Sequence, residues 1–507
     1  MEVLCCLIFC LSVFLVSKLV LQQKQHLPPA PIALPILGHL HLLKKSLHRK
    51  LEALASHYGP IFRLQLGSRS VLVVSSPSAI EECFTKNDII LSNRPYSVVG
   101  EHLGYNCTTI GWSSYGQHWR NLRRFLVIQM FSSNSLQTSS DIRNREVSHL
   151  VRQLYRGSDG ELQKVELKSI FFQLTLNIVM GMVAGKRLFG DEEVDVELRE
   201  QFLNIMKERY SNPSMNMSIL DYLPILRWVG FQSEEKKMVR FNKKRDAFFQ
   251  GLIDQRRRRM SDSTKVIQGD SKKTLVDAAL SLQQAEPEYY SDDIIKGLIL
   301  VAFTAGIETS LQTMEWAMSL LLNHPEELQK AREEIDNNVG QGRLIEESDL
   351  AKLPYLRGIV NETLRLFPVA PLLVPHMSSE ECSIEGYDVP RGTVVLVNAW
   401  AVHRDPKLWL EPTSFKPERF QGIEGEREGY KFIPFGLGRR GCPGAGMGIR
   451  MVSLALGALI QCFDWVRIGS EKVDLSEADH GLSMPKAKPL EALYVPRPTM
   501  INLYSQL

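Results

Sequence analysis

The stretch FGLGRRGCPGAG, residues 435–446, concentrates residue types that chemistry uses. Its glycines have the spacing G-x-G-x-x-G, which is typical of loops that hold the phosphates of a dinucleotide: Gly436, Gly438 and Gly441. The same stretch surrounds one cysteine, Cys442, and precedes an apolar helical pattern over 447–461. A helix N-terminus lowers the pKa of a thiol, and glycines let backbone amides turn towards the sulfur. The stretch therefore predicts either a dinucleotide cradle or a loop around a metal-binding thiolate.

The context of the glycines disfavours the dinucleotide cradle. Asp464 does lie about 20 residues further on, where a ribose acceptor is expected. The fingerprint must, however, follow a strand, and the preceding segment YKFIPF contains Pro434, which disfavours an interior parallel strand. Arg439 and Arg440 are also bulky at the point where a backbone must approach a phosphate closely.

A thiolate loop is the better interpretation of Cys442. No second Cys or His accompanies it at metal-ligand spacing, which argues against zinc. A single thiolate, with the aromatic Phe435 and the cation Arg440 nearby, suits a haem iron held from one side, because haem propionates need a cation. The alternative is that Cys442 is a buried structural cysteine, the common fate of a free cysteine.

A second group of reactive types lies inside a long apolar helical pattern from Ser291 to Asn323, which we expect to form one buried helix. Its middle reads AGIET, a small pair followed by the acid Glu308 and the hydroxyl of Thr309. Ala305 and Thr309 are four apart and share a face. The pattern indicates either a tight crossing with another helix or a groove where a small molecule meets a hydroxyl donor.

The first residues differ from the rest of the chain. The run Val3–Ser17 carries no charge, and Lys18 and Lys24 follow it. Such a run approaches the length that spans a bilayer, and the cations after it favour a cytoplasmic body. We expect a membrane anchor over residues 1–24, a proline-rich hinge over 25–38 and a catalytic domain over 39–507. A cleaved signal peptide is the alternative.

Composition narrows the remaining choices. An apolar content of 44% allows a large core, and a net charge of +3 does not favour nucleic acid as a partner. The eight cysteines show no disulfide framework, which fits the reducing cytosol. Helical patterns dominate, with a hairpin expected around Gly67, short strands near 392–400 and in the C-terminal tail, and a surface loop at 261–273. The predicted class is mainly α with small β-sheets (α+β), in one large domain.

Five segments resemble motifs of the cytochrome P-450 monooxygenases, a haem-thiolate family. FGLGRRGCPG resembles their haem-binding loop, and AGIET resembles the oxygen-activating motif of their long central helix. The other three occur in the matching order: WRNLR at 119–123, ETLR at 362–365 and FKPERF at 415–420. The resemblance covers essentially the whole chain. It implies the cytochrome P-450 fold with an N-terminal transmembrane helix of the plant microsomal type.

The resemblance assigns roles on the two sides of a haem. Cys442 would be the axial ligand of a haem b, with Phe435 packed near the sulfur. The propionates would receive charge-assisted hydrogen bonds from four side chains: Trp119, Arg123, Arg440 and His376. Many relatives carry arginine at the position of His376, so an ordinary histidine is the alternative there.

On the side where O2 binds, Glu308 and Thr309 would deliver protons. The alternative is that Thr309 only bonds back to the carbonyl of Ala305. A Glu-Arg-Arg network would be structural rather than catalytic: Glu362, Arg365 and Arg419. We expect Glu362→Ala to lose haem incorporation, because a buried pair of this kind tolerates no missing partner.

The resemblance also implies a reaction and a setting. Microsomal relatives take NADPH-derived electrons from NADPH-cytochrome P-450 reductase at the endoplasmic reticulum and insert one oxygen atom of O2 into a small hydrophobic substrate. The segments 366–376 and 480–492 resemble the plant group that contains isoflavone 2′-hydroxylases. The expected substrate is a plant specialised metabolite: an isoflavonoid, lignan, other phenolic or terpenoid. The alternatives are closure of a ring or methylenedioxy bridge without retained oxygen, and a non-catalytic haem scaffold.

Two further sets of residues follow from the resemblance. The segments expected to contact substrate are Tyr96–Trp112, Phe202–Ser218, Ile299–Thr309, Val369–Val374 and Leu482–Met484. The cations expected to face an acidic reductase are Arg120, Arg124, Lys431 and Arg439. Ordinary solvated charge is the alternative for each of these cations.

Overall fold

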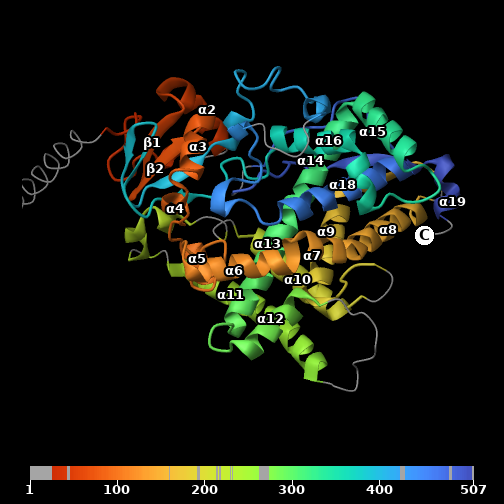
Figure 1. The fold of residues 1–507 in the computed structure, drawn as a ribbon, viewed down its shortest axis with the longest axis horizontal. Coiled ribbons are helices and arrows are strands. Elements are labelled where there is room, and N and C mark those ends of the chain that lie inside the picture. The colour runs from red at the N-terminus through yellow and green to blue at the C-terminus, as the bar shows by residue number, and fades with distance from the viewer. Residues whose placement is uncertain are drawn as a thin grey trace, which may run out of the picture.

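The computed structural model describes most of the chain and is mainly helical. The described residues are 26–42, 46–158, 160–190, 194–212, 215, 218–228, 230, 232–261, 273–422, 429–478 and 482–504. A four-stranded sheet lies at one end of the molecule, and long helices form the rest of its body (Figure 1). The predicted class, mainly α with small sheets, is confirmed. The predicted anchor at 1–24 and nearly all of the predicted loop at 261–273 lie outside the described residues.

Three small sheets contain the strands. The first has the order β1 (Ile61–Leu66), β2 (Arg69–Val74), β7 (Val394–Val397), β4 (His376–Met377). The second has the order β3 (Gln163–Glu166), β9 (Glu491–Pro496), β8 (Phe463–Val466), and the third pairs β5 (Cys382–Ile384) with β6 (Tyr387–Val389). β1 and β2 form the predicted hairpin, and β7 lies parallel to β2. The sheets therefore hold late segments of the chain against early ones.

The helices before residue 290 are α2 (Leu47–Tyr58), α3 (Pro77–Phe84), α4 (Asp88–Leu91), α5 (Val98–Leu103), α6 (Gln117–Leu126), α7 (Ser133–Thr138), α8 (Ser140–Arg156), α9 (Leu167–Ala184), α10 (Val196–Tyr210), α11 (Gln232–Ser261) and α12 (Leu275–Ala285). Those after it are α13 (Asp292–Gly306), α14 (Glu308–Asn323), α15 (Pro325–Asn338), α16 (Pro354–Leu366), α17 (Ala399–Val402), α18 (Ala445–Cys462) and α19 (Ile501–Tyr504). α14 packs against α9, α16 and α18, and these four helices form the centre of the core.

The long helix predicted from Ser291 to Asn323 is interrupted. Ser291 is its N-cap, as predicted, and its hydroxyl accepts a hydrogen bond from the amide of Ile294 (3.4 Å). α13 and α14, however, end and begin on either side of Ile307. The prediction of one unbroken helix is therefore wrong at this residue.

A side-chain hydrogen bond of the AGIET motif spans the interruption. The hydroxyl of Thr309 donates to the carbonyl oxygen of Ala305 at 2.6 Å. A threonine hydroxyl that bonds back in this way competes with the helix's own hydrogen bonds and bends the helix. The bond is the alternative considered for Thr309 from the sequence, and it places the motif at a break in the helix.

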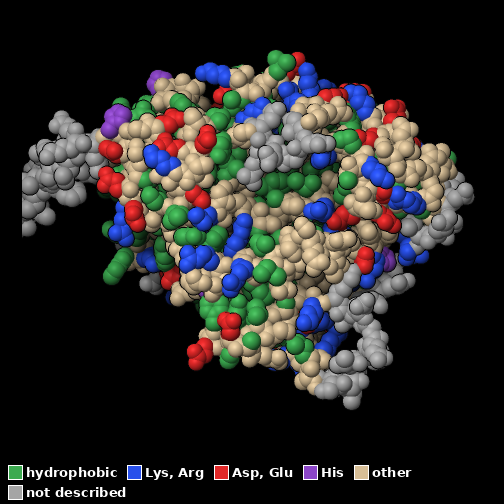
Figure 2. All heavy atoms as spheres, viewed as in Figure 1, with side chains coloured by type: hydrophobic (Ala, Val, Ile, Leu, Met, Phe, Trp, Pro, Cys, Tyr) green, Lys and Arg blue, Asp and Glu red, His purple; other side chains and the backbone are tan. Residues whose placement is uncertain are grey.

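Three described helices are long and apolar enough to cross a membrane: Leu167–Ala184, Asp292–Asn323 and Ala445–Cys462. In each of them, between 61% and 78% of the most apolar 18-residue stretch is buried inside the protein, so these are core helices. Trp316 on α14 is fully buried, and its ring stacks on that of Phe367 with 4.0 Å between centroids. On the face of the molecule in Figure 2, cationic and anionic side chains are interspersed.

The predicted Glu-Arg-Arg network is present. Glu362 and Arg365 on α16 are fully buried, and Arg365 donates to both carboxylate oxygens of Glu362 at 2.7 and 2.8 Å. Arg419 donates to the same carboxylate at 3.1 Å. The remaining donors of Arg365 reach the backbone carbonyls of His403, Pro412 and Ser414. The network therefore fastens the segment 403–419 to α16.

Substitution of Glu362 by alanine would leave Arg365 buried without its carboxylate. We expect Glu362→Ala to lower the free energy of unfolding by about 3–5 kcal/mol and to abolish haem incorporation, rather than only slow turnover. Urea unfolding and the haem content of the purified protein measure these effects. The matched control is Glu418→Ala, which removes a half-exposed ion pair with Lys330 and should cost about 0–1 kcal/mol. Normal haem content in Glu362→Ala would contradict the structural role.

Candidate active site

The loop at 435–446 consists of tight turns around Cys442. The amide of Cys442 donates to the carbonyl of Phe435 at 2.8 Å, which closes the loop. Gly436 and Gly438 have left-handed φ angles of 67° and 62°, and a Cβ on Gly438 would collide with the carboxylate of Asp88. No strand lies within residues 429–434, all of which the structure describes, so the dinucleotide interpretation lacks the strand that it requires. The glycines serve the turns around the cysteine.

α18 begins just after the cysteine loop turns. Gly444 is its N-cap, with φ −89° and ψ 7°, and the helix begins at Ala445, so Pro443 lies before it. The turn at Gly444 still directs two amides towards the sulfur. Burial raises the pKa of the Cys442 thiol above its ordinary value, whereas the amides of Gly444 and Ala445 and the charge of Arg123 lower it.

Solvent can reach Cys442, although protein atoms surround it on most sides. A residue at the bottom of a surface depression has both properties. The described residues contain no group of three or more His, Cys, Asp or Glu side chains that could hold a metal ion. A metal bound at Cys442 must therefore bring most of its ligands with it, as a haem iron does.

Trp119 and Arg123 lie on one face of α6, beside the cysteine loop. The ring centroid of Trp119 is 4.6 Å from the guanidinium carbon of Arg440 and 5.8 Å from that of Arg123. The indole nitrogen of Trp119 is buried and has no hydrogen-bond partner in the described part of the chain. A buried N–H without an acceptor costs free energy, so this atom fits an acceptor that a ligand supplies.

Arg440 is anchored by backbone carbonyls. Its guanidinium donates to those of Ser92 (2.9 Å), Ile110 (3.2 Å) and Ser113 (2.6 Å). Three of its five N–H groups are thereby engaged. Burial lowers its pKa to about 10, and the charge of Arg123 contributes. The two N–H groups of Arg440 that make none of these bonds are the ones that could make the predicted contact with a propionate.

The site also contains Arg94, which the sequence gives no reason to single out. Its side chain is buried and donates to the backbone carbonyls of Gly111, Val374 and Pro375. Burial lowers its pKa to about 9, and the charge of Arg440 adds to the effect. Its partners lie far along the chain and are all backbone groups, so no motif or spacing marks it.

These arginines give the site an uncompensated positive charge. Among the described residues, no carboxylate lies within ion-pair distance of Arg94, Arg123 or Arg440. Buried cations without partners are strongly destabilising. A ligand that carries two carboxylates and a metal ion matches this donor set: the thiol and its amides for the metal, and Trp119 with the arginines for the carboxylates. The site thus fits the haem expected from the sequence.

His376 fits its predicted role less well. Its Nδ1 lies 2.9 Å from the carbonyl oxygen of Leu91, which can only accept, so Nδ1 carries the proton. Burial lowers the pKa of His376 to about 3, and the charges of Arg94 and Arg440 contribute. A neutral ring of this tautomer presents a lone pair at Nε2, so it offers no donor to a propionate. Phe435 is partly buried and packs against the main core, so its expected place near the sulfur stays a prediction.

Glu308 lies at the break between α13 and α14, next to Thr309. Gln312, one turn further on, donates to Oε1 of Glu308 at 3.1 Å and to the hydroxyl of Ser483 at 3.3 Å. Burial raises the pKa of Glu308, and two nearby cations together with Gln312 offset only part of the shift. Glu308 therefore holds a proton more readily than an ordinary glutamate. Gln312, whose amide orients this carboxyl, was not predicted; its i+4 spacing from Glu308 is the signal that marks it.

The five predicted substrate segments meet around α13 and α14. The rings of Phe202 and Phe303 lie 5.5 Å apart, and the amide of Met484 donates to the carbonyl of Val369 at 3.0 Å. The indole of Trp316 on α14 donates to the carbonyl of Met484 at 2.9 Å. A small cavity lies between α6 and α13, and its lining includes Ile110, Leu122, Gly297 and Leu298.

Comparison with known proteins agrees with this geometry. The model of the family described as Cytochrome P450 matches residues 28–491. The relatives include Cytochrome P450 81Q32 of Catharanthus roseus, 51% identical over 98% of this chain and 96% of the relative. The (+)-piperitol/(+)-sesamin synthase CYP81Q2 of Sesamum radiatum is 47% identical over 98% and 97%, and an isoflavone 2′-hydroxylase of Glycyrrhiza echinata is 45% identical over 98% of both chains.

The unpartnered indole nitrogen makes a specific prediction. Trp119→Phe keeps a ring beside Arg440 but removes the N–H, so we expect haem to dissociate about tenfold faster. Transfer of haem to an apoprotein acceptor measures the rate. The free energy of unfolding of the haem-free chain should not fall, because the lost N–H has no protein partner.

The matched control is Trp465→Phe. The indole of Trp465 donates to the carbonyl of Leu459 at 2.9 Å, so this variant loses an internal hydrogen bond but should retain haem normally. Equal haem release from wild-type protein and Trp119→Phe would show that the indole nitrogen does not face the cofactor.

Proposed function

This chain belongs to the cytochrome P450 family and is a monooxygenase of that family, and from this premise we propose its reaction. The proposed reaction is hydroxylation of a hydrophobic plant specialised metabolite with O2 and NADPH-derived electrons. The substrate is an isoflavonoid, a lignan, another phenolic or a terpenoid. The observation that carries the proposal is the Glu308–Thr309 pair at the helix break, in a chain whose relatives include isoflavone 2′- and 3′-hydroxylases.

The residues on the cysteine side bind and orient the cofactor. Haem, when bound, supplies the iron at which O2 is activated. Cys442 would hold the iron through its sulfur, and Phe435 begins the loop that carries this cysteine. Trp119 and Arg123 would donate hydrogen bonds to the propionates, and Arg440 would add charge while it holds Ile110 and Ser113 in place.

Glu308 and Thr309 hold and move protons on the opposite side. The hydroxyl of Thr309 donates its hydrogen bond to the carbonyl of Ala305, so the lone pairs of its oxygen can accept a hydrogen bond from a water molecule. Burial raises the pKa of Glu308 and so brings that pKa closer to neutral pH. The two groups can therefore pass protons inward through water, while the apolar segments around α13 limit the access of bulk solvent.

Exposed apolar side chains support the proposal that the protein lies at the endoplasmic-reticulum membrane. Residues 1–24 would be its single-pass anchor, and its catalytic domain would be cytosolic. Ile32 and Ile36 are 94% and 85% exposed, and Trp228 is 88% exposed. The amides of Gly67 and Ser68 donate to the carbonyls of Leu37 and Tyr222, so both exposed segments border the β1–β2 turn. Apolar side chains gathered near an expected anchor, with a tryptophan among them, suit contact with lipid.

The face around the cysteine loop supports docking of NADPH-cytochrome P-450 reductase. Arg120 and Arg439 are exposed, and their guanidinium carbons each lie 5.5 Å from the ring centroid of Tyr115. α6 and the cysteine loop thus present cations side by side, although Arg439 also pairs with Asp88 at 3.2 Å. Arg124 is exposed as well, and Lys431 lies over the ring of Trp409. An acidic partner bound here would lie close to Cys442.

A second candidate reaction has support in the name of one relative. The protein of Sesamum radiatum is a synthase of piperitol and sesamin rather than a hydroxylase. The corresponding reaction of this chain would close a ring or a methylenedioxy bridge and retain no oxygen in the product. The two candidates predict different product masses.

Product mass decides the reaction. The chain is expressed in yeast microsomes with a plant reductase and NADPH, and offered isoflavones, lignans, indoles and abietane diterpenes. We expect a product that gains one oxygen atom, and Thr309→Ala should form it about 100-fold more slowly per NADPH oxidised, because a proton-transfer group typically contributes at least that factor.

Thr313→Ala is the matched control. The hydroxyl of Thr313 bonds back to the carbonyl of Thr309 at 2.9 Å, so both variants delete a threonine hydroxyl of the same helix that makes the same kind of bond. Thr313→Ala should turn over nearly normally. A product that loses two hydrogens would favour the bridge- or ring-forming reaction. Equal loss in both variants would remove the specific role of Thr309.

A further inference from the structure

A polar cavity lies between α8 and the end of α9, and it shares no residue with the cysteine site. Its volume is about 190 Å³, whereas one water molecule needs only about 10–15 Å³, so a small ligand has room there. The lining residues come from α8, from α9 and from the segment that follows α9: His149, Arg152, Gln153, Arg156, Gln173, Arg187 and Gly190. All of them except the glycine have polar side chains.

Cations converge on this cavity from two elements. Those of α8 recur every three or four residues, so they share one face of the helix: Arg145, His149, Arg152 and Arg156. Arg187 reaches the cavity from the segment after α9. Burial lowers the pKa of His149, and the charge of Arg187 adds to the effect. Two further arginines act in the same direction, and only one carboxylate, that of Glu146, opposes them. The cavity is therefore electropositive.

Glu146, the carboxylate beside the cavity, is already engaged. Its side chain is 2% exposed and accepts hydrogen bonds from Nε of Arg187 at 3.0 Å and from the amide of Asn177 at 3.1 Å. Asn177 in turn accepts from the backbone amides of Leu188 and Phe189, both at 3.0 Å. These bonds fix the segment that carries Arg187, so its guanidinium is held in place before a ligand binds.

Two arginines of the cavity have donors left for a ligand. The buried Nε of Arg152 has no hydrogen-bond partner among the described residues, and neither terminal nitrogen of Arg187 has one. Gly190 provides the space for the guanidinium of Arg187, because a Cβ on this glycine would lie 2.7 Å from the central guanidinium carbon. A buried N–H without an acceptor costs free energy, so Arg152 fits an acceptor that a ligand supplies.

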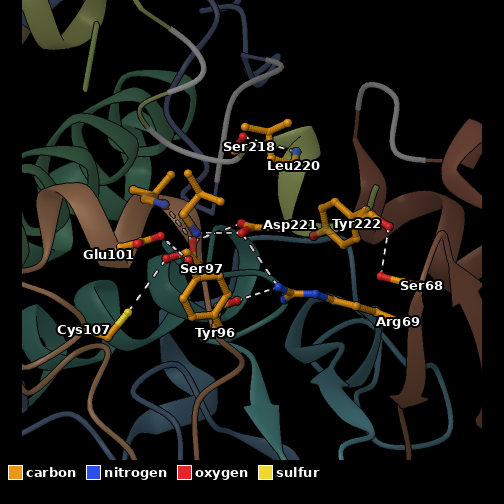
Figure 3. Close-up of polar contacts among 12 residues, drawn as sticks. Ser68, Arg69, Tyr96, Ser97, Glu101, Cys107, Ser218, Leu220, Asp221 and Tyr222 are labelled. Atoms are coloured by element: carbon orange, nitrogen blue, oxygen red, sulfur yellow. Dashed lines mark hydrogen bonds and ion pairs between the residues drawn. The ribbon is translucent and has the colours of Figure 1, made fainter. Parts of the chain in front are cut away.

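Two arginines elsewhere show how this fold compensates a cation. Arg143, also on α8, donates to the carboxylate of Glu347 at 2.6 Å. Arg69 lies 3.7 Å from Asp221, which also caps α5 by accepting from the amide of Val98 at 2.7 Å (Figure 3). Within the described part of the chain, Arg152 pairs with no carboxylate of this kind. Its charge is therefore left for an anionic ligand to compensate.

The donors around the cavity indicate the class of anion. Guanidinium groups bind phosphate oxygens through two parallel hydrogen bonds. The side-chain amides of Gln153 and Gln173 and the imidazole of His149 are further donors in the lining. A phosphate group offers three terminal oxygens and up to two charges, whereas a carboxylate offers two oxygens and one charge. A phosphate group therefore matches this set of donors better.

The position of the cavity favours a soluble phosphate over a lipid headgroup. α8 lies towards the end of the molecule opposite the four-stranded sheet (Figure 1). The exposed apolar residues that we propose to contact lipid border the β1–β2 turn of that sheet: Ile32, Ile36 and Trp228. A lipid phosphate would therefore have to reach far along the catalytic domain to enter the cavity.

We propose that this cavity binds the phosphate group of a small soluble molecule, held by Arg152 and Arg187 with His149 beside it. The bound phosphate joins α8 to the segment after α9, so it stabilises the folded chain as its concentration rises. The inference does not depend on the proposed reaction, because the cavity and the cysteine site have no residue in common.

Calorimetric titration with inorganic phosphate tests the site. The full-length, haem-loaded protein is held in nanodiscs of neutral lipid at constant ionic strength. We expect one phosphate to bind per chain, and Tm to rise with phosphate but not with chloride. Arg152→Gln should weaken binding about tenfold or more, because a hydrogen bond to a charged group is lost. Arg152→Lys keeps the charge without the fork of donors and should weaken binding less.

The matched control is Arg145→Gln. It removes the same charge from the same face of α8, but Arg145 is exposed and does not line the cavity. Binding should stay within about twofold of wild type, because salt screens exposed charges. If Arg152→Gln does not fold, modification of the wild-type chain by phenylglyoxal, followed by peptide mass spectrometry, decides the test. Phosphate at about ten times its Kd should slow modification of Arg152 and Arg187 about tenfold and leave Arg145 unchanged.

Three results would overturn the proposal. The first is an absence of saturable binding, or equal weakening by Arg152→Gln and Arg145→Gln. The second is binding that appears only when Asp191→Asn, Glu192→Gln and Glu193→Gln are combined, because these carboxylates follow Gly190 in the sequence and would then be the occupant. The third is protection of Arg152 by nanodiscs that contain phosphatidic acid but not by free phosphate, which would assign the cavity to a lipid.

Discussion

The site depends on stabilising an anionic sulfur inside the protein. Burial raises the pKa of the Cys442 thiol, and the amides of Gly444 and Ala445 and the charge of Arg123 offset only part of that shift. The protein alone therefore leaves the thiol protonated at neutral pH, and a metal cation must supply the remaining stabilisation. Glycines around the sulfur follow from this requirement, because only small residues allow backbone amides to approach it closely and the loop to turn at Gly436 and Gly438.

The arginines around Cys442 also need an opposite charge, which the ligand of the site would supply. Arg94 and Arg440 use most of their donors on backbone carbonyls. Arg440 thereby holds residues 110–113 to the cysteine loop, and Arg94 holds residues 374–375 and Gly111 to its own segment. Burial lowers the pKa of both side chains, and no carboxylate of the described residues pairs with either. An anionic ligand completes the site electrostatically. The same arginines bond the carbonyls of Ile110, Gly111 and Ser113, so cofactor binding and the course of the chain before α6 depend on one set of contacts.

The sequence predicts those features that depend on short spacing. The hairpin around Gly67, the pair Glu362–Arg365 and the shared face of Trp119 and Arg123 are set by neighbours within a few residues, and the structure contains them. Other features depend on partners that are distant or not specified by residue type. The break at Ile307 is not marked by residue type, because Thr304 and Thr313 make the same backbone bond as Thr309 without a break beside them. The neutral tautomer of His376 depends on a carbonyl 285 residues away. The cap that Asp221 provides to α5 is of the same kind, since its partner Val98 is 123 residues away.

The most direct test of the account is the absorption spectrum of the reduced protein with carbon monoxide. Wild-type protein should show the band of thiolate-ligated haem. Cys442→Ser should lose that band even where it retains haem, because the axial sulfur is gone. Cys462→Ser, which changes a buried cysteine on α18, should keep it. A thiolate-type band in Cys442→Ser would show that another residue ligates the iron, and would contradict the assignment on which the rest of the site is built.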